Sequence, residues 1–243
     1  MHAARPLNIT PPPLPPRISH LGLVDYTPTL HAMQAHNRAF AARGLREVGD
    51  EIWLLQHPPV YTLGLAGKPE HVRDAGGIAV IRVERGGQVT YHGPGQLVAY
   101  LMLDIKRLGF GVKELVRRIE QSLIDLLAEY EIEGYRRASM PGVYIKVNGK
   151  SGGEHAKIAA LGLRIANHAT YHGLSLNVDM DLEPFARINP CGYEGLKVAQ
   201  LSDFGVTDTM DIIGGRLVEL LTVQLYGQLY GQPCDEPYGK HHG

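Results

Sequence analysis

The spacing of apolar residues along the chain predicts three helices. In residues 112–130 they recur every three or four positions, which places them on one face of a helix. Residues 28–46 are rich in alanine and follow Thr27-Pro28, a pair typical of an N-cap and a first helical position. Residues 208–229 predict a closing helix. The apolar face of the central helix holds Val112, Leu115, Val116, Ile119, Leu123, Leu126, Leu127 and Tyr130.

Shorter apolar or alternating segments predict strands between these helices. Such segments cover residues 51–56, 60–63, 78–83, 97–105 and 142–147. Residues 157–166 and 170–178 alternate and are separated by a short turn, which predicts a β-hairpin or adjacent antiparallel strands. Strands and helices are intermixed without a regular βαβ order. We therefore expect an α+β fold with a mixed or antiparallel sheet and flanking helices.

The length fits one large domain or two small ones. We expect a Pro-rich flexible lead at residues 1–17, a single domain at 18–229 and a loose polar tail at 230–243. The net charge of −1 gives no global field for nucleic acid or an anionic membrane, and no apolar run approaches a membrane span. The N-terminus lacks the apolar segment of a secretory signal, and the chain has only Cys191 and Cys234. We therefore expect a reducing, cytoplasmic location.

A glycine-rich stretch at residues 85–96 (RGGQVTYHGPGQ) precedes the strand predicted at 97–105. Glycines lie on both sides of Thr90, Tyr91 and His92, and they expose backbone that another molecule can approach closely. A tight turn followed by a bulge is one interpretation. A ligand-binding surface is the other, because polar side chains lie between the glycines.

Cys191 is a candidate nucleophile, although an isolated cysteine is more often a small buried apolar residue. It lies in the turn 187–193 (RINPCGY), where Pro190 and Gly192 would hold the thiol at a defined, exposed position. Such a role requires a group that lowers the pKa of the thiol. The candidate partners are His92, His155, His172 and Lys157. Lys157 leads into an apolar segment, so it is either an edge residue with a solvated ammonium or a base inside a cleft.

Three other patterns are excluded as cofactor or metal sites. Residues 148–151 (NGKS) resemble the end of a phosphate-binding loop, but Tyr144 stands where its first glycine is required. His168 and His172 would lie about 13 Å apart on a strand, too far to share a metal ion. The glycines at 93 and 95 are followed by Val98 and a strand, which does not fit a dinucleotide site. We therefore expect no metal and no cofactor.

Four segments together resemble the octanoyltransferases of lipoate biosynthesis. They are residues 85–96, 157–164 (KIAALGLR), 171–178 (YHGLSLNV) and 188–192 (INPCG), and the resemblance covers roughly residues 18–225. It implies the catalytic-domain fold shared by biotin and lipoate protein ligases. It also implies transfer of an octanoyl group from octanoyl-acyl carrier protein to a lysine of an apo lipoyl domain. The acceptors would be 2-oxoacid dehydrogenase E2 subunits and the glycine cleavage H protein.

The resemblance also assigns roles to residues. Cys191 would carry the acyl group as a thioester, and Lys157 would lower the pKa of the thiol and shuttle protons. The turn before Lys157 is longer than in the family, so Lys150 competes for this role. We expect Gly86, Gly87, Gly93 and Gly95 to form a groove floor, with Tyr91 and His92 beside the reacting end. The substrate-binding residues would be Arg85, Gly86, Gly87, Gln88, Val89, Thr90, Tyr91, His92, Ala160, Leu161, Gly162, Gly173, Leu174 and Ser175.

Other functions stay open at this point. Exchange of one thioester for another is nearly balanced in energy and aminolysis of a thioester is downhill, so acyl transfer needs no ATP. An ATP-dependent lipoate or biotin protein ligase on the same fold would use an acyl-adenylate and would not need Cys191. An inactive acyl-binding protein and a hydrolase with water as the acceptor are further alternatives.

Overall fold

A computed structural model describes residues 15–43, 48–147, 154–189 and 195–227. The expected polar turn with Lys150, the tail and most of the Pro-rich lead lie outside these residues, as does Cys191. The strands are β1 (Arg17–Leu23), β2 (Glu51–Gln56), β3 (Val60–Leu63), β4 (Ala79–Arg82), β5 (Val89–His92), β6 (Gln96–Met102), β7 (Gly134–Arg137), β8 (Met140–Val147), β9 (Glu154–Ala166), β10 (Ala169–Asn177) and β11 (Lys197–Val198). The α-helices are α1 (Tyr26–Arg43), α2 (Ile105–Leu108), α3 (Val112–Glu129) and α4 (Met210–Tyr226).

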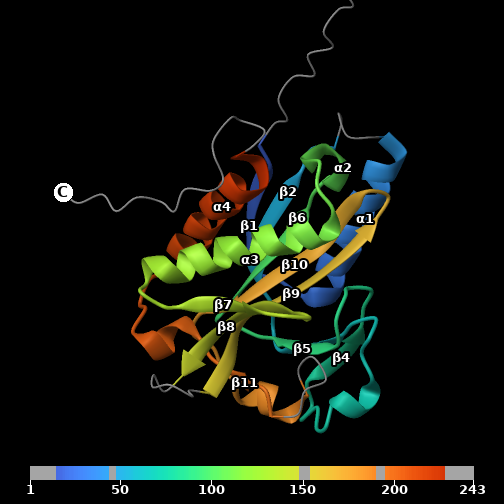
Figure 1. Ribbon diagram of the computed structural model, residues 1–243. Coiled ribbons are helices and arrows are strands. Elements are labelled where there is room, and N and C mark those ends of the chain that lie inside the picture. The colour runs from blue at the N-terminus through green and yellow to red at the C-terminus, as the bar shows by residue number, and fades with distance from the viewer. Residues whose placement is uncertain (1–14, 44–47, 148–153, 190–194, 228–243) are drawn as a thin grey trace, which may run out of the picture.

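The strands form a large mixed sheet and a small one (Figure 1). The large sheet has the order β1-β2-β6-β10-β9-β8-β7, and β11 adds to β9. Its neighbouring strands are antiparallel except at β1–β2 and β9–β11. The small sheet, in the order β4-β3-β5, lies beside the ends of β9 and β10 (Figure 1). This arrangement confirms the expected α+β class with a mixed sheet and flanking helices.

Helices cover both faces of the large sheet. α3 and α4 cross one face, and α1 packs on the opposite face (Figure 1). The alternation in β6 explains this, because Leu97, Ala99 and Leu101 belong to the core beneath α3 and α4. The residues between them, Val98, Tyr100 and Met102, belong to the core beneath α1. Because β6 is buried on both faces, its sequence is mostly apolar and lacks the alternation of polar and apolar residues.

The predicted elements differ from the observed ones mainly at their ends. The hairpin predicted at 157–166 and 170–178 is confirmed as β9 and β10, with β9 three residues longer at its start. The first helix begins at Tyr26, so Thr27 is not its N-cap and the prediction of a cap at this residue is wrong. Pro28 lies in the first turn, where a missing N–H removes no helical hydrogen bond. The sequence analysis did not predict β1, β5, β7, β11 or α2.

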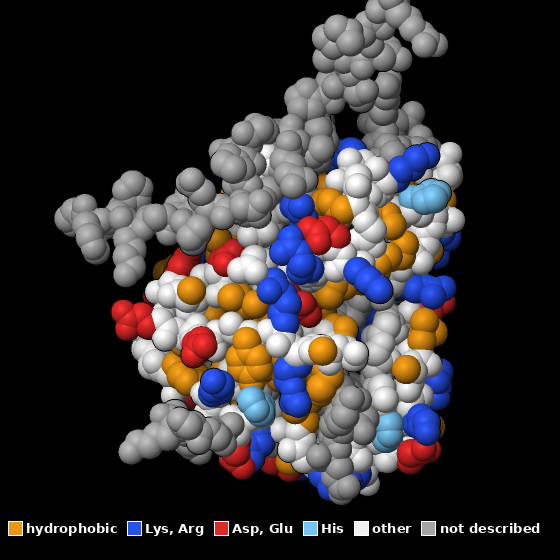
Figure 2. Space-filling model, viewed as in Figure 1, with side chains coloured by type: hydrophobic (Ala, Val, Ile, Leu, Met, Phe, Trp, Pro, Cys, Tyr) orange, Lys and Arg blue, Asp and Glu red, His pale blue; other side chains and the backbone are white. Residues whose placement is uncertain are grey.

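The face of the molecule that carries α3 and β7 has side chains of both charges. Figure 2 shows Lys and Arg side chains spread over the face that carries α3 and β7, with Asp and Glu side chains among them. This mixture agrees with the net charge of −1. Within the described residues, no helix is long and apolar enough to cross a membrane.

Candidate active site

A pocket lies where the small sheet meets the large one. It is a partly open cavity of about 750 Å³ when the solvent at its mouth is included. Its walls come from β9 and β10 of the large sheet and from β5 with the loop that precedes it. Of the residues expected to bind substrate, all except Gly86 and Tyr91 line this pocket, and Lys157 lines it with them. Three segments far apart in sequence thus meet at one cavity.

Arg85 and Gly86 fix the glycine-rich loop to β3 and β9. The Arg85 guanidinium is buried and donates to the hydroxyl and carbonyl of Thr62 on β3 at 2.7–3.1 Å, and to the carbonyl of Gly86 at 2.9 Å. The Gly86 N–H donates to the carbonyl of Leu163 on β9. Gly162 makes the approach possible, because a Cβ there would lie 3.1 Å from both the Arg85 side chain and the Gly86 carbonyl. The loop is therefore fixed to both sheets, and the buried cation lies at the pocket wall.

Lys157 reaches the pocket through an irregularity in β9. Val143 and Tyr144 of β8 pair with Ala159 and Lys157, so Ile158 is an extra residue on β9. This bulge shifts the alternation of side chains by one position. Ile158 and Ala159 consequently both belong to the core beneath α3 and α4. Without the extra residue, Lys157 would point into that apolar core; with it, Lys157 lines the pocket.

The Lys157 ammonium is buried and well bonded. The residue is 5% exposed, its Nζ donates to the Pro141 carbonyl oxygen at 2.8 Å, and it lies 5.4 Å from the centre of the Tyr144 ring. A charged amine in this setting can stabilise a nearby anion and exchange a proton with a bound reactant. The alternative of a solvated edge lysine is therefore wrong for this residue.

Histidine and tyrosine side chains form one end of the pocket. Tyr26 of α1, Tyr100 of β6, His92 of β5 and His172 of β10 line it. Behind them, His57 Nε2 shares a hydrogen bond of 2.8 Å with the Tyr100 hydroxyl. Burial lowers the pKa of His92 to about 3, with the charges of His57 and Arg85 adding to the effect. Burial, followed by Arg85, lowers the pKa of His172 to about 3.

We expect these two histidines to make the folded protein sensitive to acid. Their usual pKa is 6.5, so between pH 6.5 and about 3 the unfolded chain binds protons that the folded protein does not. Their contribution to the free energy of unfolding is complete above pH 6.5 and is lost as the pH falls through this window. Each histidine contributes a slope of about 1.4 kcal/mol per pH unit, so unfolding in urea at pH 7 and pH 5 should differ by about 3–4 kcal/mol.

A variant of one of these histidines provides the control for the pH dependence. His172→Asn removes one titrating group, and asparagine tolerates the positive φ of 61° at this position. The difference in unfolding free energy between pH 7 and pH 5 should then fall by about 2 kcal/mol, the contribution of one histidine. An unchanged difference would show that His172 is not held neutral in the folded protein.

Two expectations about the glycine-rich stretch require correction. Gly93 and Gly95 do not form a groove floor, because a Cβ at Gly95 would lie 1.9 Å from the Asp179 carbonyl oxygen. Their turn packs against backbone, and the Gly95 carbonyl accepts the N–H groups of Val178 and Asp179. Tyr91 does not flank the pocket, since its ring packs against Tyr61 and Phe185 at 5.4–5.5 Å between centroids. The turn interpretation thus holds for Gly93 and Gly95, whereas Gly87 lines the pocket.

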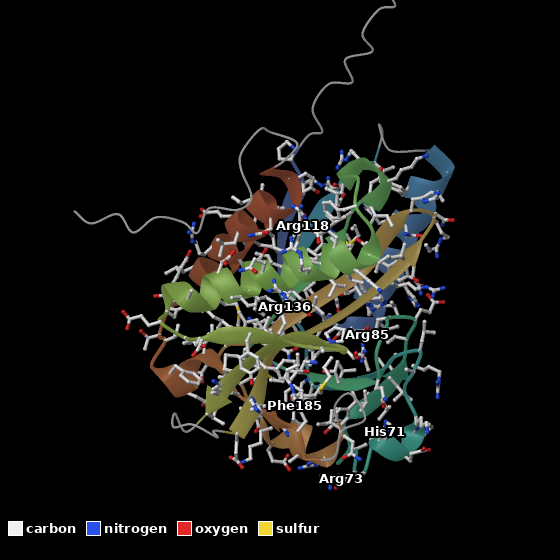
Figure 3. The ribbon with its side chains drawn as sticks, viewed as in Figure 1. His71, Arg73, Arg85, Arg118, Arg136 and Phe185 are labelled. Carbon is white, nitrogen blue, oxygen red and sulfur yellow. The ribbon has the colours of Figure 1, made fainter. Side chains whose placement is uncertain are left out.

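The remaining candidate residues lie elsewhere. His155 is exposed and bonds to the Tyr135 hydroxyl away from the pocket lining. His168 lies in the turn before β10, outside the pocket lining. Sequence reasoning also missed residues that line the pocket, namely Tyr26, Tyr100, Ile158, Ala159, Asn177, Phe185 and Val198. The sequence suggests His172 as a partner for the thiol or as a metal ligand, but not as a residue of the pocket wall. Arg85 and Phe185, which both line the pocket, come from different elements (Figure 3).

Comparison with known proteins places this fold and pocket in a class. The structure is similar to a bipartite lipoate protein ligase from Thermoplasma acidophilum, with a TM-score of 0.65 and 17% identity over 87% of this chain and 84% of that one. It is also similar to a biotin protein ligase from Aquifex aeolicus, with a TM-score of 0.53 and 14% identity over 89% and 73% of the two chains. The fold is therefore that of the catalytic domain shared by lipoate and biotin protein ligases.

Sequence comparison identifies the family. Residues 28–221 match the model of the lipoyl protein ligase A/B catalytic domain. An octanoyltransferase of Dechloromonas aromatica is 58% identical over 212 residues, which cover 87% of this chain and 98% of the relative. Another, from Laribacter hongkongensis, is 55% identical over 208 residues, covering 86% and 95%. This chain belongs to the octanoyltransferase family with a lipoyl protein ligase A/B catalytic domain.

Proposed function

We propose that this protein transfers an octanoyl group from octanoyl-acyl carrier protein to a lysine of apo lipoyl domains, including those of 2-oxoacid dehydrogenase E2 subunits and the glycine cleavage H protein. The observation that carries the proposal is the buried Lys157 ammonium on the wall of a largely apolar pocket. An apolar lining favours binding of an eight-carbon chain, because each buried CH₂ contributes about 0.8 kcal/mol. The relatives are named octanoyltransferases, which supports octanoyl as the transferred acyl group.

The proposed reaction proceeds through a Cys191 thioester. The reaction starts from an ion pair in which Cys191 is a thiolate and Lys157 an ammonium, and the thiolate attacks the carbonyl carbon of the carrier thioester. The carrier sulfur leaves and takes the proton back from the Lys157 ammonium. The amine of the lipoyl-domain lysine then attacks the Cys191 thioester and loses a proton to Lys157, and the Cys191 thiolate leaves. Every proton that Lys157 gives is returned, so neither ATP nor a cofactor is consumed.

We also propose that β9 supplies backbone donors for the oxyanion of each tetrahedral intermediate. The pairing of β9 with β8 extends to Ala160, opposite Gly142. Leu161 and Gly162 follow directly and line the pocket beside the loop held by Arg85. Backbone N–H groups fixed at such a position stabilise negative charge without reorganisation when the charge develops.

The proposed function is tested by transfer in the absence of ATP. We expect the purified protein, octanoyl-acyl carrier protein and an apo lipoyl domain to give octanoyl-lipoyl domain without nucleotide. The product is measured by the mass of the intact lipoyl domain, with an acceptor-lysine variant of that domain as the control. Product that forms only when ATP and free octanoate are supplied would instead establish a ligase. Release of free octanoate with no modified lipoyl domain would establish a hydrolase.

A further inference from the structure

A buried carboxylate lies one peptide group away from Lys157. Glu120 is on α3, is buried, and its Oε1 accepts the N–H of Gly142 at 2.9 Å. That N–H belongs to the peptide group that joins Pro141 to Gly142. The carbonyl oxygen of the same peptide group accepts the Lys157 ammonium at 2.8 Å. One peptide group therefore connects the negative charge of Glu120 to the positive charge of Lys157.

Each charge lies at the end of the peptide dipole that attracts it. The carboxylate faces the N–H end of the peptide and the ammonium faces its C=O end. Hydrogen bonds aligned in this way polarise one another and strengthen each contact. Bonds to charged groups are also stronger than those between neutral ones. The chain from Glu120 to Lys157 consequently fixes the direction in which the ammonium points.

Arg136 holds the Glu120 side chain in place. Arg136 Nε on β7 lies 3.2 Å from Glu120 Oε2. The same guanidinium donates to the carbonyl of Arg117 and the side chain of Gln121, both on α3, at 2.9 and 2.7 Å. Figure 3 shows Arg136 between α3 and the strands below it. A buried carboxylate without such a partner would be costly, so Arg136 stabilises Glu120 in this position.

The backbone conformation of Gly142 and its lack of a side chain leave room for Lys157. The φ of Gly142 is 128°, a value that L side chains rarely adopt, and a Cβ there would lie 2.5 Å from Lys157 Cε. The Lys157 side chain therefore runs directly over the glycine. The bulge at Ile158 brings Lys157 to the pocket face, and the peptide of Gly142 then receives its ammonium.

We propose that Glu120 is a positioning residue for the reaction, which acts by holding the Pro141–Gly142 peptide that anchors Lys157. The expected effect of Glu120 on the rate rests on the proposed function. The anchoring of Lys157 by the Pro141–Gly142 peptide does not depend on that function. Glu120 does not line the pocket and contacts no reacting atom. Its removal should therefore change the turnover of the acyl-transfer reaction much more than the binding of either substrate.

Three variants test the inference in transfer assays without ATP. Glu120→Leu removes the acceptor and the charge, and we expect kcat to fall about 10- to 100-fold, as misplacing a catalytic group does, with KM nearly unchanged. Glu120→Gln keeps an acceptor for the Gly142 N–H and should recover a large part of this loss. Glu129→Leu is the matched control, because Glu129 is on the same helix and pairs with Arg216 on the surface. Its kcat should equal that of the wild type.

A double-mutant cycle separates positioning from general stability. If Glu120 acts through Lys157, Glu120→Leu should have no further effect on the residual kcat of Lys157→Met. An equal fold-loss in both backgrounds would overturn the inference, because it would show that Glu120 supports the fold or another residue. Melting temperatures of all variants show whether any loss of kcat comes from unfolding.

A measurement without catalysis keeps this inference distinct from the proposed function. The Lys157 side-chain signal in heteronuclear NMR, assigned with Lys157→Arg, should move in Glu120→Leu and stay in place in Glu129→Leu. A wild-type protein that transfers no octanoyl group would defeat the proposed function while this result still supported the anchoring. An unmoved Lys157 signal in a protein that does transfer would defeat the anchoring alone.

Discussion

Replacing Lys157 by methionine is expected to lower the rate of octanoyl transfer by about 10²- to 10⁴-fold, the usual contribution of a positioned acid or base. Methionine keeps most of the apolar stem that crosses Gly142 and removes only the ammonium. The loss should appear in kcat, because the charge is required when the thiolate forms and when the leaving sulfur takes up a proton. Single-turnover transfer from octanoyl-acyl carrier protein to an apo lipoyl domain measures it directly.

Lys197→Met provides the matched control for this prediction. Lys197 pairs with Glu154 at the surface and lies on β11, the strand that pairs with the Lys157 segment of β9. Loss of a surface pair changes stability by less than about 1 kcal/mol, so its activity should match the wild type. Comparable activity of Lys157→Met and the wild type would rule out Lys157 and return Lys150 to consideration as the catalytic lysine.

Much of the fold follows from local patterns in the sequence. The apolar face of α3 repeats at helical spacing over its whole length, and Ile119, Leu123 and Leu127 are all fully buried. The hairpin of β9 and β10 follows from alternation and a short turn. These elements were predictable because their own side chains decide which face is buried.

Other parts of the fold depend on distant partners. β5 was not predicted because Val89 to His92 gain their strand conformation by pairing with β3, which lies more than twenty residues earlier. β7 was missed for a similar reason, since it is short and edge-located beside β8. Their residues carry no periodic signal of their own, and tertiary pairing decides their structure.

Some residues of the candidate site can likewise be predicted from local sequence, and others cannot. The glycine-rich loop and Lys157 could be selected from sequence because their residue types are unusual in those positions. Tyr26, Tyr100 and Phe185 could not, since an aromatic residue on a helix or strand is most often part of the core. The bulge at Ile158 is visible only in the pairing of β9 with β8, and it decides that Lys157 points to the pocket. The relation of Glu120 to Lys157 likewise requires the three-dimensional arrangement.

Replacing Cys191 by alanine is expected to abolish both the acyl-enzyme and the transfer reaction. Cys191 lies outside the residues that the structure describes, so this prediction rests on the sequence motif and the proposed mechanism. Loss of a covalent nucleophile removes the reaction path itself, and we expect the rate to fall by more than about 10³-fold. The protein should still fold, which circular dichroism and its melting temperature would show.

Intact mass after brief mixing with octanoyl-acyl carrier protein, without ATP, measures the intermediate. The wild type should gain one octanoyl group and lose it when an apo lipoyl domain is added, because aminolysis consumes the thioester. Cys234→Ala is the matched control, as Cys234 is the only other cysteine in the chain. It should acylate like the wild type, whereas Cys191→Ala should stay unmodified. An acyl group that persisted in Cys191→Ala would place the nucleophile elsewhere, and an unmodified but active wild type would show direct transfer between the two substrates.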